Sequence, residues 1–306
     1  MSKSRRDETP EPEDEVEIET ALLNAVAGDE PGEYFVLANW NHLPIDPLEI
    51  NGCIVSVRSL ADQFQWKTRY ELDTWIFVVR RLPSGRLLVG TSDGTLIRIS
   101  QGNIEIIDTG IESGITDIWV LDEQSCWLAH AEGVSHWDGN RISRQGPTSR
   151  VNVLHGLSPD FAVAVGHEGL VLLFDGIKWQ KVDSSPTNKP LVSVFCIDRD
   201  QIFVGGWRGA LYKWDGATRW RRIDFMDDIA SDDHNIMAIV QYRGDIYACV
   251  GEHGLYRIQG SAAERVHSFY CDHATVINES LVITGGILFA EFDGTDWAQV
   301  EINLPD

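Results

Sequence analysis

The stretch VGGWRGALYKWDGATRW, residues 204–220, decides the fold because it is one copy of a repeat. An apolar run ends at Gly205, a second apolar run follows Gly209, and an Asp215-Gly216 pair precedes a tryptophan. Related copies lie at 89–108, 128–145, 164–183, 204–224, 249–266 and, in degenerate form, 283–302. In some of them Gln-Gly replaces Asp-Gly, and the tryptophan is not present in all of them. A period of roughly 35–45 residues indicates an architecture of repeated supersecondary units.

Each copy is preceded by another apolar run, such as LVSVFCIDRD at 191–200, so one unit contains four expected strands, a to d in chain order. The continuous apolar run predicts that strand a is buried on both faces. The alternating pattern of strand d, as in KWQKV at 178–182, predicts a half-exposed strand. The Asp-Gly pair between strands c and d predicts a two-residue hairpin turn.

Four antiparallel strands repeated in this way predict an all-β fold, a single β-propeller of four-stranded blades. Six blades fill residues 74–303, and 16–72 supplies an atypical first blade. We therefore expect seven blades, with six as the alternative. Strand a of the first blade is placed at 16–20, and its other strands at 33–40, 51–60 and 64–72.

The N-terminal residues differ in composition from the repeats. Residues 1–15 are rich in Pro and Glu, which predicts a disordered acidic tail and assigns 16–306 to the propeller. No apolar segment follows Arg5-Arg6, so we expect no secretory signal. No apolar run is long enough to span a bilayer either.

The unit Gly-x-x-Gly…Asp-Gly-x-x-Trp resembles those of WD-repeat-like and bacterial propellers. Trp137-Asp138 and Trp214-Asp215 look like the WD dipeptide, but they precede a glycine at the c–d turn, and no Gly-His pair opens each unit. The resemblance implies a propeller and identifies no subfamily. Trp179, Trp220 and Trp297 are expected to pack between neighbouring blades, with ligand stacking as the alternative.

The charge of the chain limits the classes of partner that it can bind. The net charge is −22, and the first 33 residues carry 11 acidic and 3 basic side chains. A field of this sign repels nucleic-acid phosphates and anionic lipids and attracts basic proteins. We expect a basic protein partner, no nucleic acid and no membrane, while the oligomeric state stays open.

The five cysteines form no Cys-x-x-Cys pair, and most lie among apolar residues. They are expected to be reduced and buried, which favours the cytoplasm. The chain also lacks the Gly-x-Ser-x-Gly, Walker A and Gly-x-Gly-x-x-Gly motifs. We expect no enzymatic activity, no catalytic residue, no cofactor and no metal.

The b–c corners combine a constant glycine with variable residues before it, which is how a scaffold presents a binding surface. The d–a loops are expected on the same face and add further carboxylates. Trp207 and Arg208 belong to residue types that are enriched at interface hot spots. The expected partner-binding residues are Asp93, Glu132, His167, Glu168, Trp207, Arg208, Glu252, His253, Asp227 and Asp228.

Two alternatives concern these loops. Trp207 could close the central channel, or His167 and His253 could bind a metal with Glu168 and Glu252. His136 and His155 fall within expected strands and are interpreted as core or interface histidines.

The function that the sequence favours is a non-enzymatic, protein-binding propeller. Its most concrete form is an acidic cytoplasmic inhibitor or immunity protein that blocks a basic toxin. The alternatives are a scaffold subunit of a larger assembly and a metal-dependent hydrolase or lyase at the channel mouth.

Overall fold

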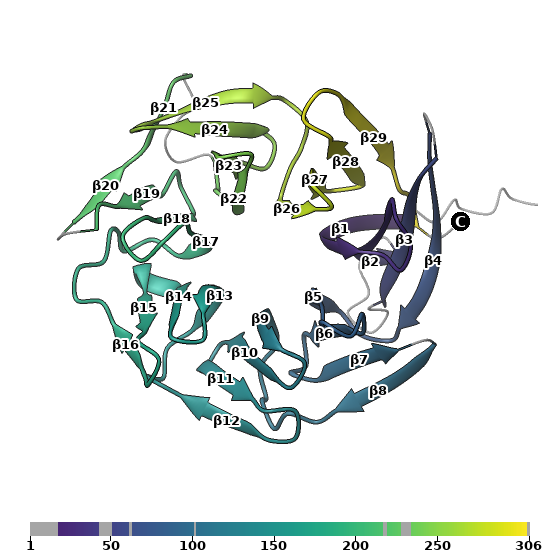
Figure 1. Cartoon of the computed structure of the whole chain (residues 1–306), viewed down its shortest axis with the longest axis horizontal. Coiled ribbons are helices and arrows are strands. Elements are labelled where there is room, and N and C mark those ends of the chain that lie inside the picture. Colours follow the sequence, from purple (N-terminus) through teal and green to yellow (C-terminus); the bar gives the residue numbers. More distant parts are fainter. Residues whose placement is uncertain are drawn as a thin grey trace, which may run out of the picture.

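The chain forms a ring of seven sheets (Figure 1). The computed structural model describes residues 18–42, 51–60, 63–100, 102–216, 219–227 and 234–304. Each sheet contains four consecutive antiparallel strands, and one sheet has a fifth, parallel strand at its edge. This arrangement confirms the all-β, seven-bladed propeller over the six-bladed alternative. Outside the strands, the helical element of the described residues is one 3-10 turn, η1 (His167–Gly169). The expected tail at 1–15 lies outside the described residues.

The blades follow one another along the chain. Strands a are β1 (Ile18–Ala27), β5 (Ile76–Arg81), β9 (Ile115–Asp122), β13 (Val151–Ser158), β17 (Leu191–Cys196), β22 (Ala238–Tyr242) and β26 (His273–Ile277). Strands b are β2 (Glu33–His42), β6 (Leu87–Thr91), β10 (Ser125–His130), β14 (Phe161–Gly166), β18 (Ile202–Gly206), β23 (Asp245–Cys249) and β27 (Ser280–Gly285). Strands c are β3 (Asn51–Leu60), β7 (Leu96–Ser100), β11 (Gly133–Trp137), β15 (Val171–Phe174), β19 (Leu211–Trp214), β24 (Leu255–Gln259) and β28 (Leu288–Phe292). Strands d are β4 (Gln63–Leu72), β8 (Asn103–Ile107), β12 (Ile142–Gln145), β16 (Trp179–Lys181), β20 (Trp220–Arg222), β25 (Ala262–His267) and β29 (Trp297–Glu301).

One further strand links two blades. The loop that leaves blade 5 forms β21 (Asp224–Phe225), which pairs in parallel with β25 at the outer edge of blade 6. Among the described residues, no helix has the length and the apolar character needed to cross a membrane.

Strand a of the first blade lies further along the chain than the predicted 16–20. β1 runs from Ile18 to Ala27 and is built mainly from the apolar residues after position 20. Leu22 and Ala25 are 1% and 4% exposed, because they pack into the core between the first and last blades. Burial of this apolar segment stabilises the folded chain more than burial of the acidic residues before it would.

The prediction that strand a is buried on both faces was wrong. Strand b has that position: every residue of β6, β14, β18 and β27 is buried. Strands a line the central channel, so their side chains alternate between the core and the channel, as in β17. Both sets of strands are rich in apolar residues, which is why the apolar run alone could not distinguish them.

Two residues join strands c and d in blades 2 and 6, where Ser100 pairs with Asn103 and Gln259 with Ala262. The prediction of two-residue turns at the Asp-Gly pairs, however, was wrong. Four residues separate the paired Phe174 and Trp179, and five separate Trp214 and Trp220. In the blade 4 turn, Asp175 Oδ1 accepts the backbone N–H groups of Ile177 and Lys178, both at 2.9 Å, and only Gly176 has a positive φ, 90°. The carboxylate thus closes a longer loop than the Asp-Gly pair suggested.

The core lies between the blades, as seven apolar clusters that each join two neighbouring sheets. Trp179, Trp220 and Trp297 belong to these interfaces, as predicted. Among the described residues no strand is shared between the ends of the chain, since the first sheet contains β1–β4 and the last contains β26–β29. Across this junction the Leu22 N–H donates to Gly286 O at 2.6 Å, and the Leu304 N–H donates to Thr20 Oγ1 at 3.2 Å.

Candidate functional site

The b–c and d–a loops emerge on the same face of the ring, which we call the loop face; the a–b and c–d turns form the turn face. Backbone hydrogen bonds join the two kinds of loop. The His167 N–H donates to Arg150 O at 3.1 Å, and the Ser92 N–H donates to Trp75 O at 2.8 Å. Each of these bonds fixes a b–c corner to a d–a loop, so the loop face is held in place by its own backbone.

The constant glycine of the b–c corner is explained by this docking. Gly169 has φ +68°, and a Cβ atom there would lie 1.7 Å from Thr187 O in the following d–a loop. Gly94 has φ +84°, and its Cβ atom would lie 2.0 Å from Ile111 O. Only glycine accepts both the positive φ and the close approach of a carbonyl oxygen.

Trp207 and Arg208 form the blade 5 corner, and their backbone is anchored on both sides. The Trp207 N–H donates to Pro190 O at 3.0 Å, and the Arg208 N–H donates to Asn235 Oδ1 at 3.1 Å. Lys189 Nζ donates to Arg208 O at 2.7 Å. Trp207 is 46% exposed and is not among the residues that line the channel cavity, so the structure does not support its role as a channel plug.

The other predicted b–c residues occupy the loop face in blades 2, 3, 4 and 6, and some of them have local partners. The Thr91 hydroxyl donates to Asp93 and lowers the pKa of that carboxyl, and the Thr95 N–H also donates to Asp93 Oδ1 at 3.1 Å. Glu132 lies 3.8 Å from Arg144 Nη1. Both carboxylates therefore contribute to the local fold as well as to the surface charge.

Glu168 and Glu252 are exposed at their corners. Glu168 has φ 54° within the turn η1. His167 and His253 are both partly buried, in blades 4 and 6, so blade 5 separates them. His253 instead stacks edge-on against His234, with ring centroids 5.8 Å apart.

The structure assigns Asp227 to an anchor in the loop between blades 5 and 6. The Tyr256 hydroxyl donates to Asp227 Oδ2 at 2.7 Å, and Arg265 Nε lies 3.4 Å from the same oxygen. Through these two contacts Asp227 attaches the segment after β21 to blade 6. Asp228 lies outside the described residues.

The predicted residues are spread around the face and do not converge on a single point. In the described ranges, no group of three or more His, Cys, Asp or Glu side chains is arranged to hold a metal ion. The five cysteines are buried, and burial raises the pKa of Cys53, Cys126 and Cys196 to about 12. These three thiols are therefore protonated at neutral pH and are poor nucleophiles.

Exposed apolar side chains on the loop face were not predicted. Trp75 is 39% exposed, Tyr270 40% and Met226 69%, and all three lie in d–a loops. Phe77, 38% exposed, lines the channel just beyond Trp75. The available signal was the aromatic residue shortly before a strand a, as in TWIF and FYCDH, but these loops have no repeated pattern.

The loop face is acidic. Its described loops contain ten carboxylates and three cationic side chains, Arg150, Lys189 and Arg208. The carboxylates are Asp73, Asp93, Asp108, Glu112, Glu132, Glu168, Asp183, Asp227, Glu252 and Asp272. The described turns of the opposite face contain 12 carboxylates and six cations, so charge alone does not distinguish the faces. The exposed Trp75, Trp207 and Tyr270 do.

The central channel is a cavity of about 480 Å³ lined by the strands a. Arg80 spans its wall: Nη2 lies 2.5 Å from Asp117 Oδ1, and Nε donates to Ile118 O at 2.9 Å. Burial raises the pKa of Asp117, an effect that Arg80 and the Leu154 N–H oppose. These bonds join blades 2, 3 and 4.

The two histidines of the wall are uncharged at neutral pH. Burial lowers the pKa of His155 and of His273 to about 4, and the charge of Arg80 adds to the effect. His155 Nδ1 accepts the Cys196 N–H at 3.3 Å, which joins blades 4 and 5. The interpretation of His155 as an interface histidine is confirmed. His136 is partly buried in β11, and its Nε2 lies 2.8 Å from Ser125 Oγ of the same blade.

Comparison with known proteins identifies the fold. No protein-family model and no curated protein sequence matches the chain. The WD40 β-propeller domain of Doa1 superposes with a TM-score of 0.67 at 11% identity, over 87% of this chain and 94% of that one. A chain of the mitotic checkpoint complex gives 0.61 at 12% identity, over 99% and 98%. The extracellular domain of the putative one-component system BT4673 from B. thetaiotaomicron gives 0.64 at 12% identity, over 87% of this chain and 37% of that one. The chain therefore has the fold of the WD40 propellers, and its subfamily is not identified.

Proposed function

We propose that this propeller is a non-enzymatic protein-binding module whose loop face binds a basic protein. The observation that carries the proposal is the exposure of Trp75, Trp207 and Tyr270 among ten carboxylates and three cations. A few side chains, most often Trp, Tyr and Arg, supply most of the binding energy at protein interfaces, and surrounding charges raise the association rate and help to select the partner. Anchored corners lower the entropy lost on binding.

The most concrete form of this function is inhibition. A rigid acidic face can cover the cationic cleft of a basic enzyme, as a cytoplasmic immunity protein does for a toxin. The five free, buried cysteines support a reducing compartment. A scaffold role is the second candidate, favoured by the similarity to a chain of the mitotic checkpoint complex. The metal-dependent hydrolase or lyase gains no support, because His167 and His253 lie two blades apart.

The test compares capture by three forms of the protein. Wild type, Trp207→Ala and Ile177→Ala are immobilised, and proteins recovered from the source organism's extract are quantified by mass spectrometry. Ile177 is the matched control because it is 84% exposed in a turn-face loop of blade 4.

We expect a basic protein that is recovered by wild type and Ile177→Ala, and at least tenfold less by Trp207→Ala. Its association rate should fall as salt is raised. Recovery that is lost with Ile177→Ala instead would move the binding site to the turn face. A partner that the protein binds without inhibiting would favour the scaffold.

A further inference from the structure

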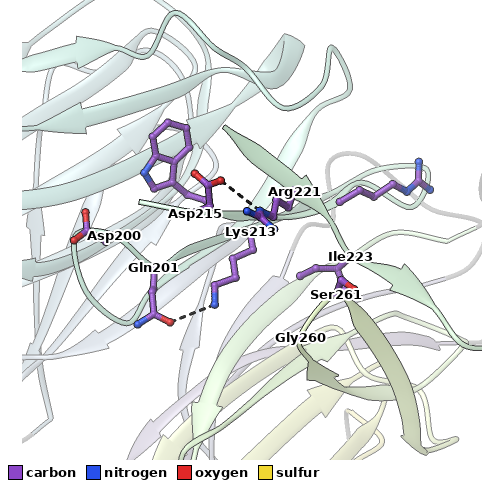
Figure 2. A pocket seen from close by; sticks show the side chains of 10 residues that line it. Asp200, Gln201, Lys213, Asp215, Arg221, Ile223, Gly260 and Ser261 are labelled. Atoms are coloured by element: carbon purple, nitrogen blue, oxygen red, sulfur yellow. Dashed lines mark hydrogen bonds and ion pairs between the residues drawn. The ribbon is translucent and has the colours of Figure 1, made fainter. Parts of the chain in front are cut away.

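A groove separates blades 5 and 6 on the outer side of the ring (Figure 2). Its volume is about 440 Å³, which is within the range of small-ligand sites. Blade 5 contributes Lys213 from β19 and Arg221 and Arg222 from β20, and blade 6 contributes the turn Gly260-Ser261. The groove thus holds three cations, together with the carboxylates of Asp200 and Asp215.

Two cations face each other in this groove. Lys213 and Arg221 are directly paired across β19 and β20, so their side chains leave the sheet on the same side. Like charges directly opposite each other in an antiparallel pair are destabilising. The pair therefore concentrates positive charge beside the groove, and an anion bound there would offset the repulsion between the two side chains.

The sibling blades show what the repeat does elsewhere. The third residue of strand c is also a cation in blade 2, Arg98, and in blade 6, Arg257. In both blades the residue directly opposite is a glutamate: Glu105 lies 2.6 Å from Arg98, and Glu264 lies 3.5 Å from Arg257. In blade 5 that glutamate is replaced by Arg221.

The carboxylates nearby offset part of this charge. Asp224 Oδ1 lies 3.2 Å from Arg222 Nε, and Asp200 also lines the groove. Asp215 Oδ2 is shared by Arg221, at 3.3 Å, and Arg219, at 3.5 Å. Lys213 Nζ donates to the neutral Gln201 Oε1 at 3.2 Å (Figure 2). Asp198 Oδ2 accepts a hydrogen bond from Gln201 Nε2 at 2.8 Å. This and other hydrogen bonds lower the pKa of Asp198, and the charge of Lys213 contributes least to that lowering.

We propose that this groove binds a phosphate group, with Lys213 and Arg221 as the two cations that hold it. A phosphate carries close to two negative charges at neutral pH and accepts several hydrogen bonds, so one group satisfies both side chains. Gly260 leaves space on the blade 6 side, since no atom lies within 4 Å of a Cβ placed there, and the exposed Ser261 offers a hydroxyl. The source of the phosphate is either the free ion or a phosphorylated molecule.

The test is calorimetric titration of the full chain with sodium phosphate and with O-phosphoserine, at constant ionic strength. Arg221→Glu rebuilds the ion pair of blades 2 and 6, so this variant should fold and should bind at least tenfold more weakly than wild type. Lys213→Met is the second variant, because it removes one charge and keeps most of the aliphatic stem. Arg141→Glu changes the charge equally in an exposed turn of blade 3 and should bind as wild type does.

Melting temperatures give a second readout. In phosphate-free buffer Arg221→Glu should melt higher than wild type, because the like-charge pair is gone. Phosphate should raise the melting temperature of wild type and leave that of Arg221→Glu unchanged. Tighter binding of O-phosphoserine would identify a phosphorylated molecule as the source, and equal binding would identify the free ion. Absence of saturable binding to wild type, or equal binding by Arg221→Glu, overturns the proposal. Neither outcome depends on the loop-face partner.

Discussion

The hydroxyl of Tyr34, in blade 1, donates a hydrogen bond of 2.6 Å to Glu291 Oε1, in blade 7, across a sequence separation of 257 residues. Tyr34 is 2% exposed, and its ring lies 5.3 Å from that of Phe289. Burial, together with the nearby Glu291 carboxylate, raises the pKa of Tyr34, so the hydroxyl keeps its proton and remains a donor. Since no strand of the described residues is shared between the first and last sheets, contacts of this kind close the ring.

We therefore expect Tyr34→Phe to destabilise the propeller. The ring stays in the core, but Glu291 loses its donor in a partly buried site, which should lower the free energy of unfolding by about 1–2 kcal/mol. Urea denaturation measures the change. Tyr242→Phe is the control, because its hydroxyl donates to Phe292 O at 3.3 Å between blades that are consecutive in the chain. An equal or larger loss in Tyr242→Phe would show that closure does not depend on the Tyr34 bond.

A second prediction concerns the carboxylate that joins blades 2, 3 and 4. Asp117 is 3% exposed, lies 2.5 Å from Arg80 Nη2 and accepts the Leu154 N–H at 3.0 Å. Asp117→Ala leaves a guanidinium and a buried N–H without their acceptor, so we expect a loss of about 3–5 kcal/mol in urea denaturation.

The control for Asp117 is Asn152. Its Nδ2 donates to Leu191 O at 2.7 Å and joins blades 4 and 5 in the channel wall, but neither group is charged. Asn152→Ala should cost about 1 kcal/mol. Similar losses in the two variants would mean that the charge on Asp117 contributes nothing beyond an ordinary hydrogen bond.

The repeat made the fold predictable. The spacing of Gly, Asp-Gly and Trp predicted where the turns and the inter-blade tryptophans lie. It could do so because the blades pack against one another in the same way and use similar residues at the same positions. The assignment of burial within the blade failed, since Phe77 of a strand a and Phe203 of a strand b are equally apolar in sequence. Only the position of the strand relative to the axis decides that Phe77 lines the channel and that Phe203 is buried.

The candidate site was less predictable than the fold. The b–c corners could be located because a glycine marks each of them, and Trp207 was found in this way. Trp75 and Tyr270 lie in d–a loops of unequal length, where the repeat gives no register. The role of Asp227 depends on Tyr256 and Arg265, which are distant in sequence and meet it only in the folded chain.

A third prediction follows from the pKa of His155, which burial lowers from 6.5 to about 4. The unfolded chain takes up a proton on this residue as the pH falls below 6.5, whereas the folded chain does not. The contribution of His155 to stability is therefore complete above about pH 6.5 and is lost as the pH falls towards 4, by at most about 3 kcal/mol. His155→Gln keeps an acceptor for the Cys196 N–H and does not titrate. The variant should lose less stability than wild type between these pH values.

The control for this pH series is His167→Gln, since His167 lies on the loop face and its pKa is also lowered by burial. Urea denaturation at several pH values should show a smaller change in slope for His167→Gln than for His155→Gln. His273, also with a pKa of about 4, should account for much of the slope that remains. An unchanged slope in His155→Gln would mean that this imidazole is protonated equally in the folded and unfolded chains.

The last prediction tests whether the corner glycines hold the loop face together. Gly169 and Gly244 have φ +68° and +91°, so alanine strains the backbone at both positions, by about 1 kcal/mol. At Gly244 nothing lies within 4 Å of the added Cβ, whereas at Gly169 it would meet Thr187 O at 1.7 Å and Ser185 Oγ at 2.5 Å. Gly169→Ala must therefore also push away the d–a loop, and its melting temperature should fall several degrees further than that of Gly244→Ala. Hydrogen exchange should locate the added loss in residues 182–190, next to the Trp207 corner. Equal melting temperatures would show that this d–a loop does not depend on the blade 4 corner for its position.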